Sequence, residues 1–210
     1  MFQYRKRILL YVLGSLLFGF VILTILVSYT PVLLFDQKIS EEVQEHQHLL
    51  LDVSMKAVSW PGYAPQSMLM VLSASFIFFL FKKKREAFFI ALTLLSGVIS
   101  SSLKVLTNRP RPTDDLVRII DVAKYKSFPS GHVLLYVIFF GFLIVLMSKI
   151  KNINLAVRII VIAISAFFLF IIPISRIYLG AHWFTDVFGS ILLGLLLLFI
   201  LSYVYLKNSR

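Results

Sequence analysis

The residues of this sequence that could do chemistry lie in three short polar segments, and the last of these contains a histidine and an aspartate at helical spacing. His182 and Asp186 are four residues apart. Residues at this spacing share one face of a helix, so the carboxylate could accept a hydrogen bond from the imidazole. That bond would fix the tautomer and leave the other ring nitrogen free to attack a substrate. Arg176, six residues before His182, could reach the same anion.

A simpler interpretation of this pair is a helix-capping aspartate beside an interfacial histidine. We expect Asp186, however, to stand a full turn inside an apolar run that begins near residue 183. Ionisable side chains inside a membrane span are functional by default, because they are costly to keep there. The position of Asp186 therefore favours a catalytic pair.

The middle segment, residues 127–132, has the pattern of a helix start. Ser130 follows Pro129 and precedes an apolar run, which is the position of an N-cap residue. Gly131 would let an anion approach the free backbone N–H groups of this helix start, and His132 would stand beside that anion. Taken alone, capping explains the serine, and His132 could be an interfacial histidine.

The first segment contains two cations, Lys104 and Arg111, which are seven residues apart. Seven residues are close to two helical turns, so the two side chains could point the same way. Pro110 and Pro112 favour a rigid extended link around Arg111 over a continuous helix. Two cations near one point suit a phosphate, which an arginine can hold through two hydrogen bonds. The alternative is that both are anchors whose charges reach the membrane interface.

Apolar runs separate these segments and would position them in a membrane. Hydrophobic residues make up 59% of the 210 residues and charged residues 15%, and the mean hydropathy is +0.90. A membrane-spanning helix needs about 20 apolar residues. Six runs qualify, at about residues 8–29, 64–81, 87–105, 131–148, 155–175 and 183–206. We expect Pro173 to end or kink the fifth helix. The sequence thus predicts an all-α, polytopic membrane protein with six transmembrane helices in a single domain, residues 1–210.

Basic residues cluster on one side of the membrane if the six spans alternate in direction. The four clusters are Arg5 to Arg7, Lys82 to Arg85, Lys149 with Lys151, and Lys207 with Arg210. The positive-inside rule makes that side cytoplasmic, together with both termini. All three polar segments then lie on the extracytoplasmic face. The longest connection on that face, residues 30–63, contains an amphipathic stretch at residues 49–59 that could lie in the interface.

Composition and charge exclude several classes of protein. The net charge of +11 is explained by membrane topology and by an anion site. Basic and aromatic residues do not alternate outside the apolar runs, which argues against a nucleic-acid interface. The absence of cysteine excludes disulfides, thiolate metal sites and cysteine nucleophiles. His46 and His48 have no further potential metal ligands nearby, so we expect both to be solvated loop residues. We expect neither a metal nor another cofactor.

Taken together, the three segments resemble the signature of the type 2 phosphatidic acid phosphatase family. The family motifs are K-x6-R-P, P-S-G-H and S-R-x5-H-x3-D. In this sequence they read Lys104…Arg111-Pro112, Pro129-Ser130-Gly131-His132 and Ser175-Arg176…His182…Asp186. All three motifs are complete and in order, over residues 104–186.

The resemblance implies a role for each of these residues. His182 would attack phosphorus and become phosphohistidine, and Asp186 would orient His182 and stabilise its positive charge. His132 would protonate the leaving group and then activate water. The phosphate oxygens would be held by Lys104, Arg111, Ser130, the backbone at Gly131, and Arg176, with Arg109 as a helper. The resemblance also implies catalysis without a metal, a core helical bundle like that of the vanadium haloperoxidases, and inhibition by vanadate.

The same resemblance implies a lipid phosphate as the substrate. Bacterial members act on phosphatidylglycerophosphate, undecaprenyl diphosphate, diacylglycerol pyrophosphate, phosphatidic acid or lipid A. We favour an isoprenyl diphosphate such as undecaprenyl diphosphate, or phosphatidylglycerophosphate, in a bacterial cytoplasmic membrane. The alternatives are a phosphotransferase that passes the phosphoryl group to a second acceptor, and a non-catalytic protein that binds or transports phospholipid. Loss of His132, His182 or Asp186 would favour the non-catalytic protein, and all three are present.

Overall fold

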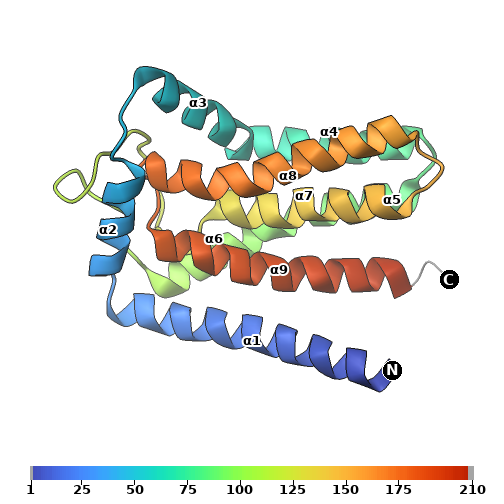
Figure 1. Cartoon of the computed structure of the whole chain (residues 1–210), viewed down its shortest axis with the longest axis horizontal. Coiled ribbons are helices and arrows are strands. Elements are labelled where there is room, and N and C mark those ends of the chain that lie inside the picture. Colours follow the sequence, from blue (N-terminus) through green and yellow to red (C-terminus); the bar gives the residue numbers. More distant parts are fainter. Residues whose placement is uncertain (1, 208–210) are drawn as a thin grey trace.

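The computed structural model describes the backbone of residues 2–207 and the side chains of residues 7–207. All regular structure in this part of the chain is helical. The elements are α1 (Phe2–Tyr29), α2 (Leu34–Val43), α3 (Leu49–Ser59), a 3-10 turn η1 (Trp60–Gly62), α4 (Gln66–Leu80), α5 (Lys84–Leu92), α6 (Leu95–Thr107), α7 (Gly131–Lys149), α8 (Leu155–Tyr178) and α9 (Phe184–Lys207). Figure 1 shows α1, α4, α7, α8 and α9 along the long axis of the molecule, whereas α2 stands across one end.

Five helical stretches within residues 2–207 are long and apolar enough to cross a membrane. They are Arg7–Tyr29, Lys84–Thr107, Gly131–Lys149, Leu155–Tyr178 and Phe184–Lys207. The second predicted span differs, because α4 has only 15 residues and measures about 22 Å, whereas the hydrocarbon core is roughly 30 Å thick. α3 and α4 meet the criterion together, as a pair bent by 60°. The predicted six-span helical fold is confirmed with this bent pair counted as one span.

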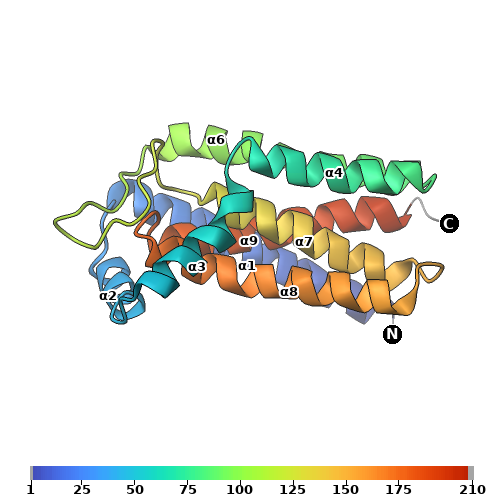
Figure 2. The same cartoon turned by 90° about the horizontal axis from the view of Figure 1, so that it is seen from above.

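Helix α7 forms the centre of the bundle. Of its apolar window 72% is buried, compared with 6–28% for the other four stretches. Figure 2 shows α7 between α4 and α8, and α7 also packs against α9. A Cβ atom on Gly194 would lie 2.7 Å from Val137, so glycine at this position allows α9 to approach α7 closely. The first residues of α7 and α9 consequently lie near each other at one end of the bundle.

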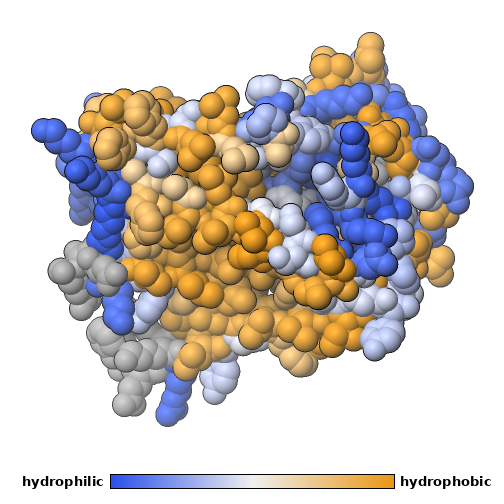
Figure 3. Space-filling model, turned by 180° about the vertical axis from the view of Figure 1, so that it is seen from behind, coloured by the Kyte–Doolittle hydropathy of each residue, from blue (hydrophilic) through white to orange (hydrophobic). Residues whose placement is uncertain are grey.

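The outer surface of the bundle is largely apolar. Figure 3 shows an apolar belt across the middle of the molecule, with hydrophilic residues at both ends. Large apolar side chains are also exposed on three of the long helices, for example Leu10 on α1, Phe76 on α4 and Phe170 on α8. Soluble monomers rarely expose a contiguous apolar patch of this extent. The belt is the surface expected of helices that are surrounded by lipid.

Pro173 was expected to end or kink α8, and of these two effects the end is not observed, because α8 continues past Pro173 to Tyr178. The helix runs on to Tyr178 because other elements hold its last turn. Ser175, for example, has its hydroxyl oxygen 2.8 Å from that of Ser59, which ends α3. Arg176 therefore projects from the last turn of a helix and not from a connecting loop.

Candidate active site

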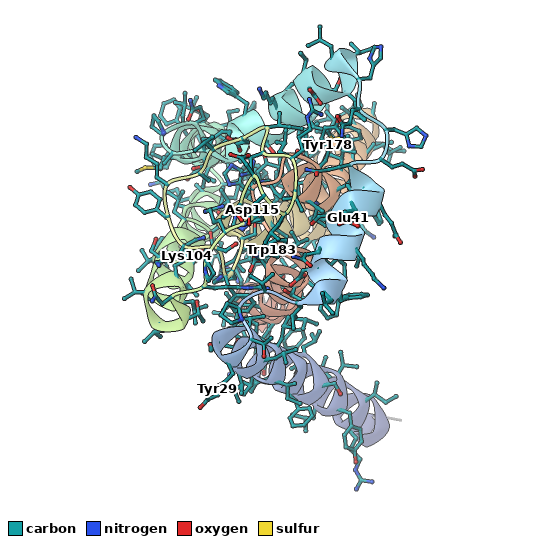
Figure 4. The ribbon with its side chains drawn as sticks, turned by 90° about the vertical axis from the view of Figure 1, so that its left-hand side faces the viewer. Tyr29, Glu41, Lys104, Asp115, Tyr178 and Trp183 are labelled. Atoms are coloured by element: carbon teal, nitrogen blue, oxygen red, sulfur yellow. The ribbon has the colours of Figure 1, made fainter. Side chains whose placement is uncertain are left out.

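The three polar segments meet at one end of the bundle, where α6 and α8 end and α7 and α9 begin. Figure 4 faces this end and shows Lys104 and Trp183 beside the loop that contains Asp115, with α2 at its edge. The N and C labels of Figure 1 lie at the opposite end of the bundle. The fold therefore places all eight predicted site residues in one region.

His182 lies in the turn between α8 and α9, two residues before α9 begins at Phe184. The four-residue spacing predicted that His182 and Asp186 share one face of a helix. This prediction is wrong, because α9 begins only after His182. The turn brings the two side chains together instead, with Nδ1 of His182 3.4 Å from Oδ2 of Asp186. Gly180 permits this turn through its φ of +66°, a conformation that favours glycine.

Asp186 was predicted to stand a full turn inside the span. It stands instead in the first turn of α9. Its Oδ2 accepts a hydrogen bond of 2.9 Å from the backbone N–H of Trp183 and another from the hydroxyl of Ser127. Its Oδ1 lies 2.6 Å from Nη1 of Arg109. The capping interpretation is thus correct in part, since the carboxylate does cap α9. The same buried carboxylate also faces His182, which capping alone does not require.

The imidazole of His182 is held in its neutral form. Burial lowers the pKa of His182 well below its usual value, and the cations Arg111, Lys104 and Arg176 lower it further. Its Nε2 lies 3.2 Å from Nη1 of Arg111. A neutral ring nitrogen beside cations that can hold a phosphate is suited to attack phosphorus.

Two of the cations, Lys104 and Arg111, donate hydrogen bonds to backbone carbonyls. Lys104 reaches residues 126 and 127 at 2.5 and 3.2 Å. Arg111 donates to Tyr125 and Ala181. Burial and the nearby positive charge of another arginine lower the pKa of Arg111 to about 10, so it remains charged at neutral pH. Because carbonyl oxygens carry no formal charge, both cations remain available to attract an anion.

The third cation, Arg176, is paired with an acid. Its Nη1 lies 2.9 Å from Oδ2 of Asp121 and donates to the hydroxyl of Tyr63 at 3.2 Å. Tyr63 also donates a hydrogen bond to Asp121. Arg176 is 1% exposed, whereas the Asp121 side chain is 17% exposed. A phosphate that binds Arg176 must therefore compete with a carboxylate that is closer to solvent.

Several buried polar atoms at this end make no hydrogen bond within the described part of the chain. They include Oγ of Ser130, Nε2 of His132, Nε of Arg176, Nδ1 of His182 and Nε1 of Trp183. Buried polar atoms are nearly always hydrogen-bonded, so this concentration of exceptions indicates a place where something binds. Ser130 precedes α7 as predicted, but its hydroxyl does not cap the helix. The hydroxyl is therefore free to contact a ligand.

His132 and Gly131 form the first turn of α7. The rings of His132 and Tyr63 meet edge to face, with their centroids 4.6 Å apart. A side chain on Gly62 would collide with the imidazole, so the close approach of this segment requires glycine. A Cβ atom on Gly131 would lie 3.2 Å from Oγ of Ser100, which shows that α6 lies close behind it. Residues 62 and 63 thus fix one face of His132.

Arg109 is not placed as a phosphate ligand, contrary to its expected role as a helper. Its guanidinium is fully buried between the carboxylates of Asp36 and Asp186. These partners are 73 and 77 residues away along the chain, so no local pattern reveals them. One signal was present, because Asp36 directly follows the apolar run Val32-Leu-Leu-Phe35. An acidic residue in such a position indicates a buried carboxylate that needs a cation.

Four further residues of the site were not identified from the sequence: Tyr63, Asp121, Ser127 and Thr185. Ser127 begins the second polar segment and Thr185 precedes the motif aspartate, so proximity to a motif was a usable signal for these two. Tyr63 stands far from any motif, in the connection before α4, and Asp121 lies in the connection between the first two motifs, where no local pattern indicates its partner. Only the folded chain brings them to Arg176.

Comparison with known proteins identifies the family. The sequence model of the PAP2 superfamily matches residues 85–210, which is more than half of the chain. Phosphatidylglycerophosphatase B from Bacillus subtilis (strain 168) is 26% identical over 193 residues, covering 90% of this chain and 92% of the relative.

Two solved structures share the fold. The crystal structure of a transmembrane PAP2-type phosphatidylglycerolphosphate phosphatase from Bacillus subtilis has a TM-score of 0.81 and 24% identity, and covers 95% of this chain and 98% of that chain. The crystal structure of Aquifex aeolicus LpxE has a TM-score of 0.59 and 27% identity, and covers 81% of this chain and 93% of that chain. With the predicted resemblance confirmed, this chain belongs to the PAP2 superfamily and is an integral membrane phosphatase.

Proposed function

We propose that the protein hydrolyses a lipid phosphate monoester or diphosphate through a phosphohistidine intermediate. The observation that carries the proposal is the environment of His182, whose Nε2 lies 3.2 Å from Arg111 and whose Nδ1 lies 3.4 Å from Asp186. One ring nitrogen faces the cations that would hold a phosphate, and the other faces an anion that stabilises positive charge on the ring. This is the arrangement of a nucleophile with its orienting carboxylate.

In the first step, the lone pair on Nε2 of His182 attacks phosphorus, and the bond from phosphorus to the leaving oxygen breaks. The electron pair of that bond stays on the leaving oxygen, which takes a proton from His132. The phosphorylated imidazole is positively charged, and Asp186 stabilises it. The cations of the site stabilise the negative charge on the phosphoryl oxygens.

In the second step, His132 is neutral and takes a proton from a water molecule, whose oxygen attacks phosphorus. The phosphorus–nitrogen bond breaks, and its electron pair returns to Nε2 of His182. Inorganic phosphate leaves, and both histidines are back in their starting forms with one water consumed. The hydroxyl of Ser130 and the N–H groups at the start of α7 would complete the phosphate site.

The position of the site supports a lipid substrate. The site lies at the end of the membrane spans, so a phosphate at the interface could enter it while the hydrocarbon chains stay in the bilayer. The curated relative named phosphatidylglycerophosphatase B is similar over 90% of this chain, which makes phosphatidylglycerophosphate the first substrate to test. An isoprenyl diphosphate such as undecaprenyl diphosphate is the second.

The distribution of charge supports an extracytoplasmic site. The turn between α4 and α5 contains Lys82 and Lys83, the turn between α7 and α8 contains Lys151, and α9 ends at Lys207. All of these positions lie at the end of the bundle opposite the site (Figure 1). By the positive-inside rule that end and both termini are cytoplasmic, and the site faces the other side.

Phosphate release by the detergent-purified full chain, with EDTA present, tests the proposal. The panel contains phosphatidylglycerophosphate, undecaprenyl diphosphate, diacylglycerol pyrophosphate and phosphatidic acid. His182→Ala should abolish release, whereas His46→Ala, which removes an exposed histidine of the α2–α3 connection, should leave it unchanged. A lipid labelled at the phosphate should transfer an acid-labile label to the wild type. Wild-type rates in His182→Ala would disprove the nucleophile, and no release from any lipid would disprove the substrate class.

A further inference from the structure

A buried arginine links α2 to the carboxylate that faces the proposed nucleophile. Nη2 of Arg109 lies 2.7 Å from Oδ2 of Asp36, and Nη1 lies 2.6 Å from Oδ1 of Asp186. All three side chains are 0% exposed. Nε of Arg109 donates to the carbonyl of Pro31 at 2.8 Å. Every nitrogen of the guanidinium therefore has a partner inside the protein, and none is left for a substrate.

Asp36 holds the beginning of α9 directly as well as through the arginine. Its Oδ1 accepts a hydrogen bond of 2.9 Å from the backbone N–H of Thr185, and its Oδ2 accepts one of 2.8 Å from the Thr185 hydroxyl. The same hydroxyl accepts a hydrogen bond of 2.7 Å from Nη1 of Arg109. Because Thr185 is the neighbour of Asp186 in the chain, these contacts fix both the backbone and the side chain that face His182.

Asp36, Arg109, Asp186 and His182 follow one another in space as a row of groups, and the charges along this row alternate in sign. Asp36 is negative, Arg109 positive and Asp186 negative, so the buried group has a net charge of −1 while His182 is neutral. Phosphorylation of Nε2 gives the imidazole a positive charge, which completes an alternating row of four. If Asp36 were absent, Arg109 would have only Asp186 as its counter-charge and would cancel the field that Asp186 exerts on the imidazole. At these distances, in a buried site, such a change in charge is strongly felt.

We propose that Asp36 and Arg109 are positioning residues of the phosphoryl transfer, acting on His182 through Asp186 without touching the substrate. The proposal rests on the proposed function, since it presumes that His182 is the nucleophile. It assigns a catalytic purpose to α2, an element outside the part of the chain that the superfamily model matches.

A double-mutant cycle tests this inference against a merely structural role. Asp36→Asn and Arg109→Lys should each lower kcat about 10- to 100-fold, by analogy with the loss of a partner that orients a metal-binding histidine or carboxylate. KM and the inhibition constant of vanadate should change less than about threefold, because the phosphate-holding groups are intact. In an Asp186→Asn background the same substitutions should cost less than about threefold in kcat, since the residue through which they act is already lost.

The control is Ser40→Ala on the same face of α2. Ser40 is 1% exposed and donates a hydrogen bond of 2.9 Å to the backbone carbonyl of Asp36, but it contacts no charge of the row. It should keep kcat within about twofold of the wild type even if the melting temperature falls. If Asp36→Asn does not fold, Thr185→Val provides the test, because it removes only the hydroxyl that joins Asp36 to Arg109.

The outcomes separate the two proposals. Full multiplication of the kcat losses in the double variants, or an equal loss of kcat in Ser40→Ala, would overturn the positioning role while leaving the phosphatase activity of the wild type intact. Absence of phosphate release by the wild type would instead overturn the proposed function. If Asp36→Asn and Arg109→Lys lower kcat when Asp186 is present but not in the Asp186→Asn background, the row of charges is part of the catalytic apparatus.

Discussion

Removal of the negative charge at Asp121 should tighten the binding of phosphate. Asp121 forms an ion pair with Arg176, one of the three cations that would hold the substrate. The carboxylate of Asp121 would remain close to a bound phosphate and repel it. Asp121→Asn keeps the size of the side chain and can still accept a hydrogen bond from Tyr63. The substitution thus removes the competing charge with little change in shape.

The size of the effect follows from the geometry of the pair. The two charges are 2.9 Å apart, and at an effective dielectric constant of about 20 their attraction is roughly 6 kcal/mol. Desolvation of the buried arginine offsets most of this attraction. Because Asp121 is partly exposed, we take the lower end of measured couplings between close charges, about 1.5 kcal/mol. This free energy corresponds to a roughly tenfold lower inhibition constant for phosphate.

Inhibition of lipid phosphate hydrolysis by inorganic phosphate and by vanadate measures this effect. Asp115→Asn is the matched control, since it removes the same charge from an exposed position in the same connection (Figure 4). It should change both inhibition constants less than about twofold, because the charge of an exposed side chain is screened by water and salt. Unchanged or weaker inhibition of Asp121→Asn would refute the reasoning and would mean that the carboxylate is needed to hold Arg176 in place.

Three further predictions concern single positions. His182 must be neutral to attack phosphorus. Because its pKa is lowered, the neutral form persists as the pH falls through 6.5, and kcat/KM should still be on its plateau at about pH 6. A decline of kcat/KM that begins at or above pH 6.5 would contradict this prediction. Ser130→Ala should not lower the melting temperature in detergent, because the hydroxyl does not cap α7, but should raise KM about tenfold through loss of a hydrogen bond to a charged group; the reverse pattern would restore the capping role. Gly180→Ala should destabilise the protein by at least about 1–2 kcal/mol, because φ of Gly180 is +66° and a Cβ atom there would collide with the carbonyl of Arg118. The control is Gly97→Ala, which should be neutral or stabilising because no atom lies within 4 Å of the added Cβ. Equal melting temperatures of the two variants would disprove the strain at Gly180.

Much of the fold follows from the length and hydrophobicity of the apolar runs, because a bilayer imposes both. The departures occur where tertiary contacts replace the bilayer as the deciding influence. The last turn of α8 forms beyond Pro173 because Ser175 is bonded to α3. The second span is short, and α4 meets the length criterion only together with the preceding helical segment, from which it is bent by 60°. Neither feature has a local sequence pattern, so neither was predictable from the chain alone.

The site shows the same division between local and long-range information. The types and order of His132, His182 and Asp186 can be read directly, since each stands within a short motif. The relation between His182 and Asp186 was predicted to arise from a shared helical face, but it arises from a turn at Gly180. The partners of Arg109 lie 73 and 77 residues away, and buried charges choose partners by proximity in space. Spacing rules that hold within one helix carry no information about such pairs.

Synthesis of the chain delivers the two halves of the site at different times. Asp36 follows α1 in the chain, whereas its partner Thr185 lies in the first turn of α9, 149 residues later. A chain that stalls after α8 has been inserted contains the cations for phosphate but lacks His182 and Asp186 in their places. If His182 is the nucleophile, hydrolysis therefore requires that α9 has entered the membrane. On this proposal, a chain that stops before α9 does not hydrolyse the lipids of the membrane into which it is being inserted.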